Sequence, residues 1–184
     1  MIDAVSAGTL AADIRLVISN CADAAGLARA AAAGIETLVL PHRSYASRAA
    51  FDRALVDALK ARRVTFVCLA GFMRLLGPEF CAAFPDAVLN IHPSLLPAFP
   101  GVDAQRQALE HGVKITGATV HFVTPELDAG PIVMQAAVSV RDDDTAESLS
   151  ARVLEVEHAI YPAALQRVLH EAWRIDGRRV VFTA

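Results

Sequence analysis

Short apolar runs alternate with helical segments over the first half of the chain, and this alternation limits the folds that the chain can adopt. Residues 14–19, 37–40, 64–70 and 87–91 are predicted to be strands, because each run is short, apolar and rich in branched side chains. A strand, a helix and a second strand in succession normally form a parallel pair. The sequence therefore predicts an α/β fold with a doubly wound, mostly parallel sheet and helices on both faces.

The segments between and after these strands carry the signals of helices and of a hairpin. Apolar side chains at Phe51, Leu55 and Leu59 mark one face of a helix over residues 47–63. Further helices are predicted over residues 22–33, over residues 103–111 and from Asp144 or Thr145 to about residue 170, and longer strands over residues 116–123 and 132–140. Asp176-Gly177 predicts a closing hairpin. Residues 1–184 are expected to form a single domain.

Composition excludes several classes of function. The chain has 17 basic and 20 acidic residues, a net charge of −3 and no basic run, so no nucleic-acid partner is expected. No apolar stretch reaches the roughly 20 residues of a membrane span, so no membrane association is expected. The three cysteines show no C-x-x-C spacing, and Cys68 is expected to be a buried thiol in a reducing, cytoplasmic setting. No spacing of His, Cys, Asp or Glu indicates a metal site.

Two short motifs place polar groups where they could act together. Residues 90–93 read Asn-Ile-His-Pro, and Asp128 precedes Ala-Gly-Pro in a loop. Side chains alternate between the two faces of a strand, so Asn90 and His92 should point the same way and Ile91 into the core. Pro93 restricts the backbone before it and should end the strand there. The sequence therefore predicts an amide and an imidazole side by side at the edge of the sheet.

An amide, an imidazole and a carboxylate are sufficient to stabilise an oxyanion and to move protons during acyl transfer. A carboxylate at Asp128 would also favour the charged form of His92. Each residue alone has a simpler interpretation. Asn90 and Asp128 could form turns, and His92 could be an ordinary core or surface residue. Only the combination favours a catalytic site.

Further segments, in a fixed order along the chain, accompany these motifs. They are Ser47-Arg48, residues 69–74 (LAGFMR), 90–97 (NIHPSLLP), 99–101 (FPG), 106–109 (RQAL), 117–123 (GATVHFV), 127–128 (LD), 130–131 (GP) and 157–162 (EHAIYP). With them the chain resembles the folate-dependent formyltransferases over nearly its whole length, most closely those that act on glycinamide ribonucleotide. The resemblance implies a Rossmann-like enzyme that transfers a formyl group from the co-substrate 10-formyltetrahydrofolate to the amine of glycinamide ribonucleotide in de novo purine biosynthesis.

The resemblance also implies roles for single residues. The catalytic residues would be Asn90, His92 and Asp128. The folate-binding residues would be Arg48, Phe72, Met73, Arg74, Leu75, Leu76, Thr124, Pro125, Glu126 and Leu127, together with Asn90 and Asp128. Pro93 and Glu157 would contact the nucleotide substrate. His121 would be either a structural residue or one that supports the site from behind.

The start of the chain departs from the family pattern. Residues 1–10 read as a helix that ends at Gly8, directly before the first predicted strand. A doubly wound domain normally begins with a strand and a Gly-rich loop that holds phosphate at a helix N-terminus. The expectation is therefore a sheet that lacks its first strand and the phosphate loop.

Other functions use the same motifs. A formyltetrahydrofolate hydrolase would take water as the acceptor, although such enzymes usually carry a preceding regulatory domain. A methionyl-tRNA formyltransferase would need a C-terminal domain and RNA-binding charge, and neither is expected. A folate-binding form without turnover would follow from loss of the phosphate loop. Both a monomer and a homodimer are compatible with the sequence.

Overall fold

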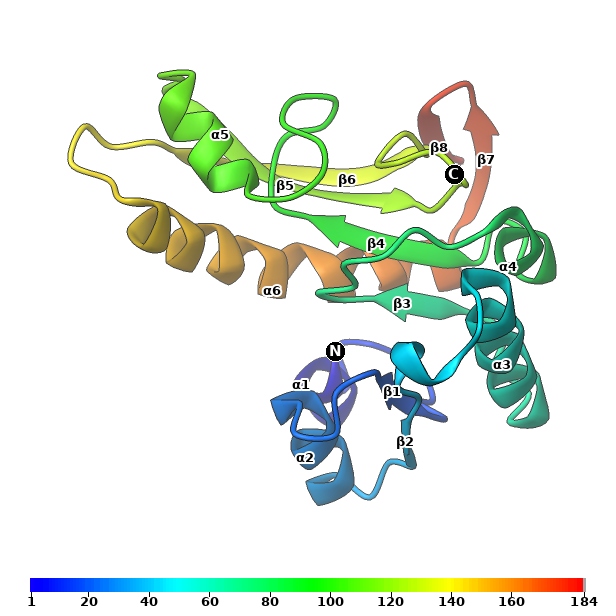
Figure 1. The fold of residues 1–184 in the computed structure, drawn as a ribbon. Helices are drawn as coiled ribbons and strands as arrows, with labels where there is room; N and C mark the ends of the chain where they lie inside the picture. The colour runs from blue at the N-terminus through cyan, green and yellow to red at the C-terminus, as the bar shows by residue number, and fades with distance from the viewer. Residues whose placement is uncertain (184) are drawn as a thin grey trace.

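The structure is a computed structural model, and it describes residues 1–183. In chain order its elements are α1 (Ile2–Ser6), β1 (Val17–Ser19), α2 (Ala25–Ala32), β2 (Thr37–Val39), the 3-10 helix η1 (His42–Ser44), α3 (Arg48–Ala61), β3 (Val67–Leu69), α4 (Pro78–Ala83), β4 (Val88–His92), α5 (Ala104–Glu110), β5 (Ile115–Phe122), β6 (Ile132–Ser139), α6 (Ala146–His170), β7 (Ala172–Asp176) and β8 (Arg179–Thr183). Figure 1 shows how the helices lie around the strands.

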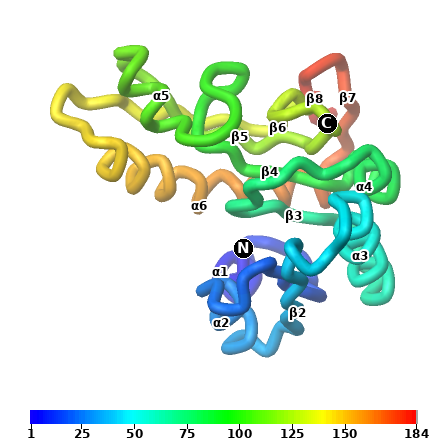
Figure 2. Tube along the Cα trace, in the orientation of Figure 1, coloured from blue at the N-terminus to red at the C-terminus, as the bar shows by residue number. Residues whose placement is uncertain are grey.

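The strands form two sheets. β1 pairs with β2 in parallel, and the other strands form a six-stranded sheet in the order β3-β4-β5-β6-β8-β7. β3 is parallel to β4, whereas β5 is antiparallel to both β4 and β6. The two-stranded sheet lies on the β3 side of the larger one (Figures 1 and 2). Within residues 1–183, β1 and β3 are not paired, although each is an edge strand.

Helices pack on both faces of the larger sheet. Val88 of β4 belongs to an apolar cluster with Phe51 of α3 and Phe80 of α4. The next residue, Leu89, points to the other face and belongs to a cluster with Leu165 of α6. This alternation confirms the predicted doubly wound α/β class, with α3 and α4 on one face and α6 on the other.

Capping residues fix where two long helices begin. The Ser47 hydroxyl accepts a hydrogen bond from the N–H of Ala50 at 3.1 Å, at the start of α3. At the start of α6, Thr145 accepts from the N–H of Ser148, and the Ser148 hydroxyl accepts from the N–H of Thr145. Each contact satisfies an N–H group that has no partner inside the helix. Of the two residues predicted to cap this helix, Asp144 and Thr145, the structure shows Thr145 in that position.

The predicted helices, long strands and closing hairpin are all present, and β1 and β3 are shorter than the apolar runs that contain them. The prediction that Cys68 is a buried thiol is correct only for the thiol group: burial raises the pKa of the thiol to about 11, but the residue as a whole is exposed. The reason is the position of β3 at the edge of its sheet, which leaves one side of the strand without a neighbour. In the part of the chain that the structure describes, none of the helices has the length and apolar character needed to cross a membrane.

Candidate active site

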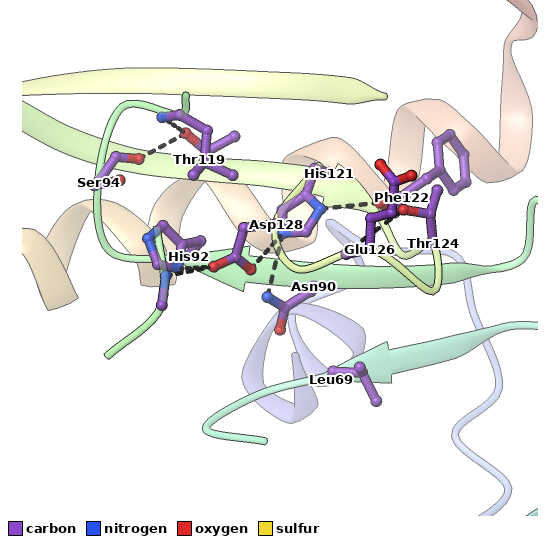
Figure 3. A network of polar contacts seen from close by, with 12 residues as sticks. Leu69, Asn90, His92, Ser94, Thr119, His121, Phe122, Thr124, Glu126 and Asp128 are labelled. Atoms are coloured by element: carbon purple, nitrogen blue, oxygen red, sulfur yellow. Dashed lines mark hydrogen bonds and ion pairs between the residues drawn. The ribbon is translucent and has the colours of Figure 1, made fainter. Parts of the chain in front are cut away.

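Asn90 and His92 lie at the carboxyl end of β4, on the face that α6 does not cover. Ile91, between them, packs against the clusters on the α6 side, as the alternation predicts. In the antiparallel ladder with β5, Asn90 lies opposite His121 and His92 lies opposite Thr119. Four polar side chains therefore share one face of two neighbouring strands (Figure 3).

His92 is held between a carbonyl and a carboxylate. The residue is only 4% exposed. Its Nε2 lies 2.8 Å from the carbonyl oxygen of Phe99, and its Nδ1 lies 3.5 Å from Oδ2 of Asp128. Both ring nitrogens thus face acceptors, and only the doubly protonated ring can donate to both. The Asn-Ile-His-Pro motif and the loop that carries Asp128 therefore meet at this imidazole.

Asp128 comes from the loop between β5 and β6, and contacts from other segments hold it in place. Its φ of +48° lies in the left-handed region, which is uncommon for a residue other than glycine. Oδ2 accepts a hydrogen bond from the N–H of Gly101 at 2.8 Å. Arg178, in the turn between β7 and β8, donates to the backbone carbonyl of Asp128 at 3.3 Å. These contacts direct the carboxylate toward the end of β4 (Figure 3).

His121 is buried, and its hydrogen bonds orient Asn90. Burial lowers the pKa of His121, which is 2% exposed, so the neutral ring is favoured. Nδ1 lies 2.9 Å from the carbonyl oxygen of Phe122 and must donate there. Nε2 is then an acceptor, and it lies 3.3 Å from Nδ2 of Asn90. The Asn90 amide can donate one hydrogen to His121 and keeps a second N–H for a ligand.

A buried polar network supports the loop that follows β4. The Thr119 hydroxyl donates to the carbonyl of Ser94 at 2.6 Å and accepts from the N–H of Leu96 at 3.0 Å. Gln135 of β6 donates to the Thr119 hydroxyl and to the carbonyl of Leu96, each at 2.9 Å. Ser94, Thr119 and Gln135 were not predicted to support the site. Thr119 and Gln135 could have been found, because each is a polar residue within a mostly apolar strand.

The residues expected to bind folate lie in two loops and at the start of α3. Met73, Leu75 and Leu127 are 78%, 44% and 54% exposed, so both loops present apolar side chains on the surface. The guanidinium carbon of Arg74 lies 5.4 Å from the ring centroid of Phe51. The Nε of Arg74 is buried and has no hydrogen-bond partner within residues 1–183.

The other residues expected to bind folate differ in how far they are exposed. Arg48 is exposed and lines a cavity of about 110 Å³ that also includes Gly77, next to the loop of residues 72–76. In that loop Leu76 is buried and Phe72 packs against the α3 and α4 cluster. In the other loop Thr124 is half-buried, and Pro125 and Glu126 are exposed.

The two residues expected to contact the nucleotide lie on different elements. Pro93 directly follows β4. Glu157 is half-buried on α6, where burial raises the pKa of its carboxyl group. The structure records no contact between Glu157 and the Asn90, His92 and Asp128 side chains. In the described part of the chain, no group of three or more His, Cys, Asp or Glu side chains is placed to hold a metal ion.

An α/β domain with an amide, an imidazole and a carboxylate converging at the carboxyl ends of its strands has the layout of an acyl-transfer enzyme. Residues 1–165 match the family model described as formyl transferase. The chain therefore belongs to the formyl transferase family.

Relatives and solved structures agree with this assignment. The chain is 46% identical over 178 residues to phosphoribosylglycinamide formyltransferase of Escherichia coli (strain K12), which covers 97% of this chain and 81% of that protein. It is 48% identical over 175 residues to the trifunctional purine biosynthetic protein adenosine-3 of Gallus gallus, which covers 95% of this chain. The chain spans only 17% of the length of that larger relative. The crystal structure of glycinamide ribonucleotide transformylase 1 from Symbiobacterium toebii matches with a TM-score of 0.97 and 51% identity, over 100% of this chain and 86% of that one.

Proposed function

We propose that this protein transfers the formyl group of 10-formyltetrahydrofolate to the amine of glycinamide ribonucleotide, a step of de novo purine biosynthesis. The convergence of Asn90, His92 and Asp128 carries the proposal, because the amide of Asn90 can donate to an oxyanion, a charged His92 can stabilise it electrostatically, and Asp128 faces the imidazole. The identity to relatives whose names state this activity supports the choice of substrates.

The geometry suggests how the reaction proceeds. The substrate amine attacks the formyl carbon, a C–N bond forms, and negative charge develops on the formyl oxygen. The free N–H of Asn90 donates to that oxygen, and the positive charge of a protonated His92 stabilises it without a direct hydrogen bond. The negative charge of Asp128 stabilises protonated His92 and the cationic amine of the tetrahedral intermediate. The bond from the formyl carbon to N10 then breaks, and the proton lost by the amine ends on N10, so atoms and charge balance.

The surrounding loops supply surfaces for the two substrates. The exposed apolar side chains of Met73, Leu75 and Leu127 are suited to contact an aromatic ring system such as that of folate. The positive charge of Arg48 is suited to a carboxylate of the folate tail. Pro93 and Glu157 remain our proposed contacts to the ribonucleotide, Glu157 as a hydrogen-bond partner for hydroxyl groups.

The direct test of this function compares two acceptors. The purified chain is incubated with a 10-formylated folate, with and without glycinamide ribonucleotide, and both the deformylated folate and the formylated amine are quantified. The expected result is deformylation that depends on the ribonucleotide, with one formylated amine formed for each folate consumed. Formate release at the same rate without the ribonucleotide would instead identify a hydrolase.

A substitution at His121 tests how Asn90 is positioned. The change of His121 to Phe keeps a buried ring but removes the acceptor for the Asn90 amide. The expected result is a turnover number lower by about 10-fold with a nearly unchanged KM, because a mobile amide stabilises the transition state less well. Steady-state kinetics of both proteins measure this difference, and an equal fall in substrate affinity would contradict it.

The same substitution should change how stability depends on pH. The folded-state pKa of His121 is lowered, so the unfolded chain binds the proton more readily than the folded one. The neutral ring therefore contributes stability above the unfolded pKa of about 6.5, and that stability is lost as pH falls through and below this value. Urea unfolding between about pH 7.5 and 5.5 should show a smaller loss of stability in the Phe variant. Equal slopes in the two proteins would show that His121 does not contribute.

A further inference from the structure

Asp52 places a carboxyl group on the apolar face of α3. It precedes Leu55 by three residues and Leu59 by seven, so the three side chains share one face of the helix. Leu55 and Leu59 belong to the core, and Asp52 is itself only 3% exposed. Burial of a polar group is costly unless it forms a hydrogen bond. Oδ2 of Asp52 accepts one from the backbone N–H of Gly77 at 2.8 Å.

Gly77 marks the end of the loop of residues 72–76 and the start of α4. Phe72 and Leu76, at the two ends of this loop, pack into the apolar cluster around α3. Met73 and Leu75, between them, are 78% and 44% exposed. The loop therefore presents these two side chains outward only as long as its ends stay in place.

α3 contacts the loop through two successive residues. The ring centroid of Phe51 lies 5.4 Å from the guanidinium carbon of Arg74, and the next residue, Asp52, accepts from Gly77. In the part of the chain that the structure describes, the backbone groups of residues 71–76 form no hydrogen bond with another segment. Apolar packing restricts direction only weakly, whereas a hydrogen bond requires a defined distance and angle. The contact between Asp52 and Gly77 is therefore the one that fixes the direction in which the loop ends.

Asp52 also explains why residue 77 is a glycine. Gly77 has a φ of −76° and a ψ of 166°, a conformation that any residue adopts. A Cβ atom added to Gly77 would, however, lie 2.9 Å from Oδ2 of Asp52. Among the residues described, no other segment has a heavy atom within 4 Å of that position. Glycine is thus required here by the close approach of the carboxyl group and not by the backbone conformation.

We propose that Asp52 is a positioning residue for folate, which holds the loop of residues 72–76 through Gly77. The inference rests on the proposed function, because it takes this loop as a folate-binding surface. Arg48, our proposed contact for the folate tail, precedes Asp52 by about one turn of α3 and lines the same cavity of about 110 Å³ as Asp52 and Gly77. Asp52 therefore fixes the loop that faces the ring system relative to the helix that carries the charge for the tail.

The test disrupts the contact from both sides. The variants are Asp52→Ala, Asp52→Asn, Gly77→Ala and the double variant Asp52→Ala/Gly77→Ala, with Asp57→Ala at an exposed position of α3 as the matched control. The dissociation constant of a 10-formylated folate is measured by equilibrium titration without an acceptor. The KM for glycinamide ribonucleotide is measured at saturating folate, and hydrogen exchange at the amide of Gly77 reports whether the contact is broken.

Asp52→Ala should raise the dissociation constant for folate by about 10-fold, whereas Asp52→Asn, which keeps an acceptor oxygen, should raise it by less than about 3-fold. Gly77→Ala should also cause about a 10-fold rise, because the methyl group displaces the carboxyl group. In the double variant the methyl group no longer meets that oxygen, so its affinity should equal that of Asp52→Ala. The KM for the ribonucleotide should change by less than about 2-fold in every variant, which a general loss of structure would not allow.

Normal folate affinity in Asp52→Ala, together with faster exchange at the Gly77 amide, would overturn the proposal. Losses that add in the double variant would also overturn it, because the added methyl group would then act elsewhere. Should Asp52→Ala fail to fold, Gly77→Ala decides alone, and unchanged folate affinity in that variant would overturn the proposal. Absence of folate binding by the unsubstituted chain would instead overturn the proposed function, and this inference with it.

Discussion

The change of Asp128 to Asn is expected to reduce formyl transfer by about 100-fold or more while folate affinity changes little. Asn has the same shape and can still accept from the N–H of Gly101, so the loop should stay in place. The charge that faces Nδ1 of His92 at 3.5 Å is lost, however, and with it the stabilisation of the imidazolium. The substitution should lower the turnover number and not the folate affinity, because negative charge develops on the formyl oxygen in the transition state and not in the bound substrates.

The measurement separates binding from turnover. The turnover number is obtained at saturating concentrations of both substrates, and folate affinity is obtained from an equilibrium titration. The change of Asp57 to Asn serves as the matched control, because Asp57 is exposed on α3 and its carboxylate lies outside the site. A variant at Asp128 that keeps more than half of the normal turnover would remove this residue from the mechanism.

The sequence was sufficient to predict those parts of the site that depend on local geometry. Asn90 and His92 share a face because a strand alternates its side chains, and the strand ends before Pro93 because proline restricts the preceding backbone. These constraints act over a few residues and are independent of the rest of the fold. The meeting of Asp128 with His92 came from the resemblance to a family, because 36 positions separate them and no local rule connects them.

The partners that hold the site were beyond sequence reasoning. The acceptor for Nε2 of His92 is the carbonyl of Phe99, and the donor to Asp128 is the N–H of Gly101. Every residue has such backbone groups, so side-chain identity does not indicate which one is used. The hydrogen bonds of Thr119 depend in the same way on the path of a loop. The exposure of Cys68 as a residue has a related cause, since an apolar run predicts a strand but not how many neighbouring strands it has.

Gly130 is expected to be the residue at which the smallest substitution has the largest structural effect. It is buried next to the end of β5, and a Cβ atom added to it would lie 1.8 Å from the carbonyl oxygen of Phe122. The clashing oxygen is a backbone atom, so a side-chain rotation cannot relieve the contact and the backbone itself must move. The change of Gly130 to Ala should lower the free energy of unfolding by about 3 kcal/mol, the upper range for overpacking. It should also lower turnover by about 100-fold, because Asp128, two residues earlier, would be displaced by about 1 Å.

Substitutions at two other glycines serve as controls, because they add the same methyl group without a steric clash. Gly26 lies in α2 with no heavy atom within 4 Å of an added Cβ, so its change to Ala should stabilise the protein by up to about 1 kcal/mol. Gly177 has equally open surroundings but a φ of +60°, so its change to Ala should show backbone strain alone, about 1 kcal/mol of destabilisation. Urea unfolding ranks the three variants, and the turnover number is measured for each. A loss at Gly130 no greater than that at Gly177 would mean that the contact with Phe122 relaxes at little cost and that the Asp128 loop is not held by close packing.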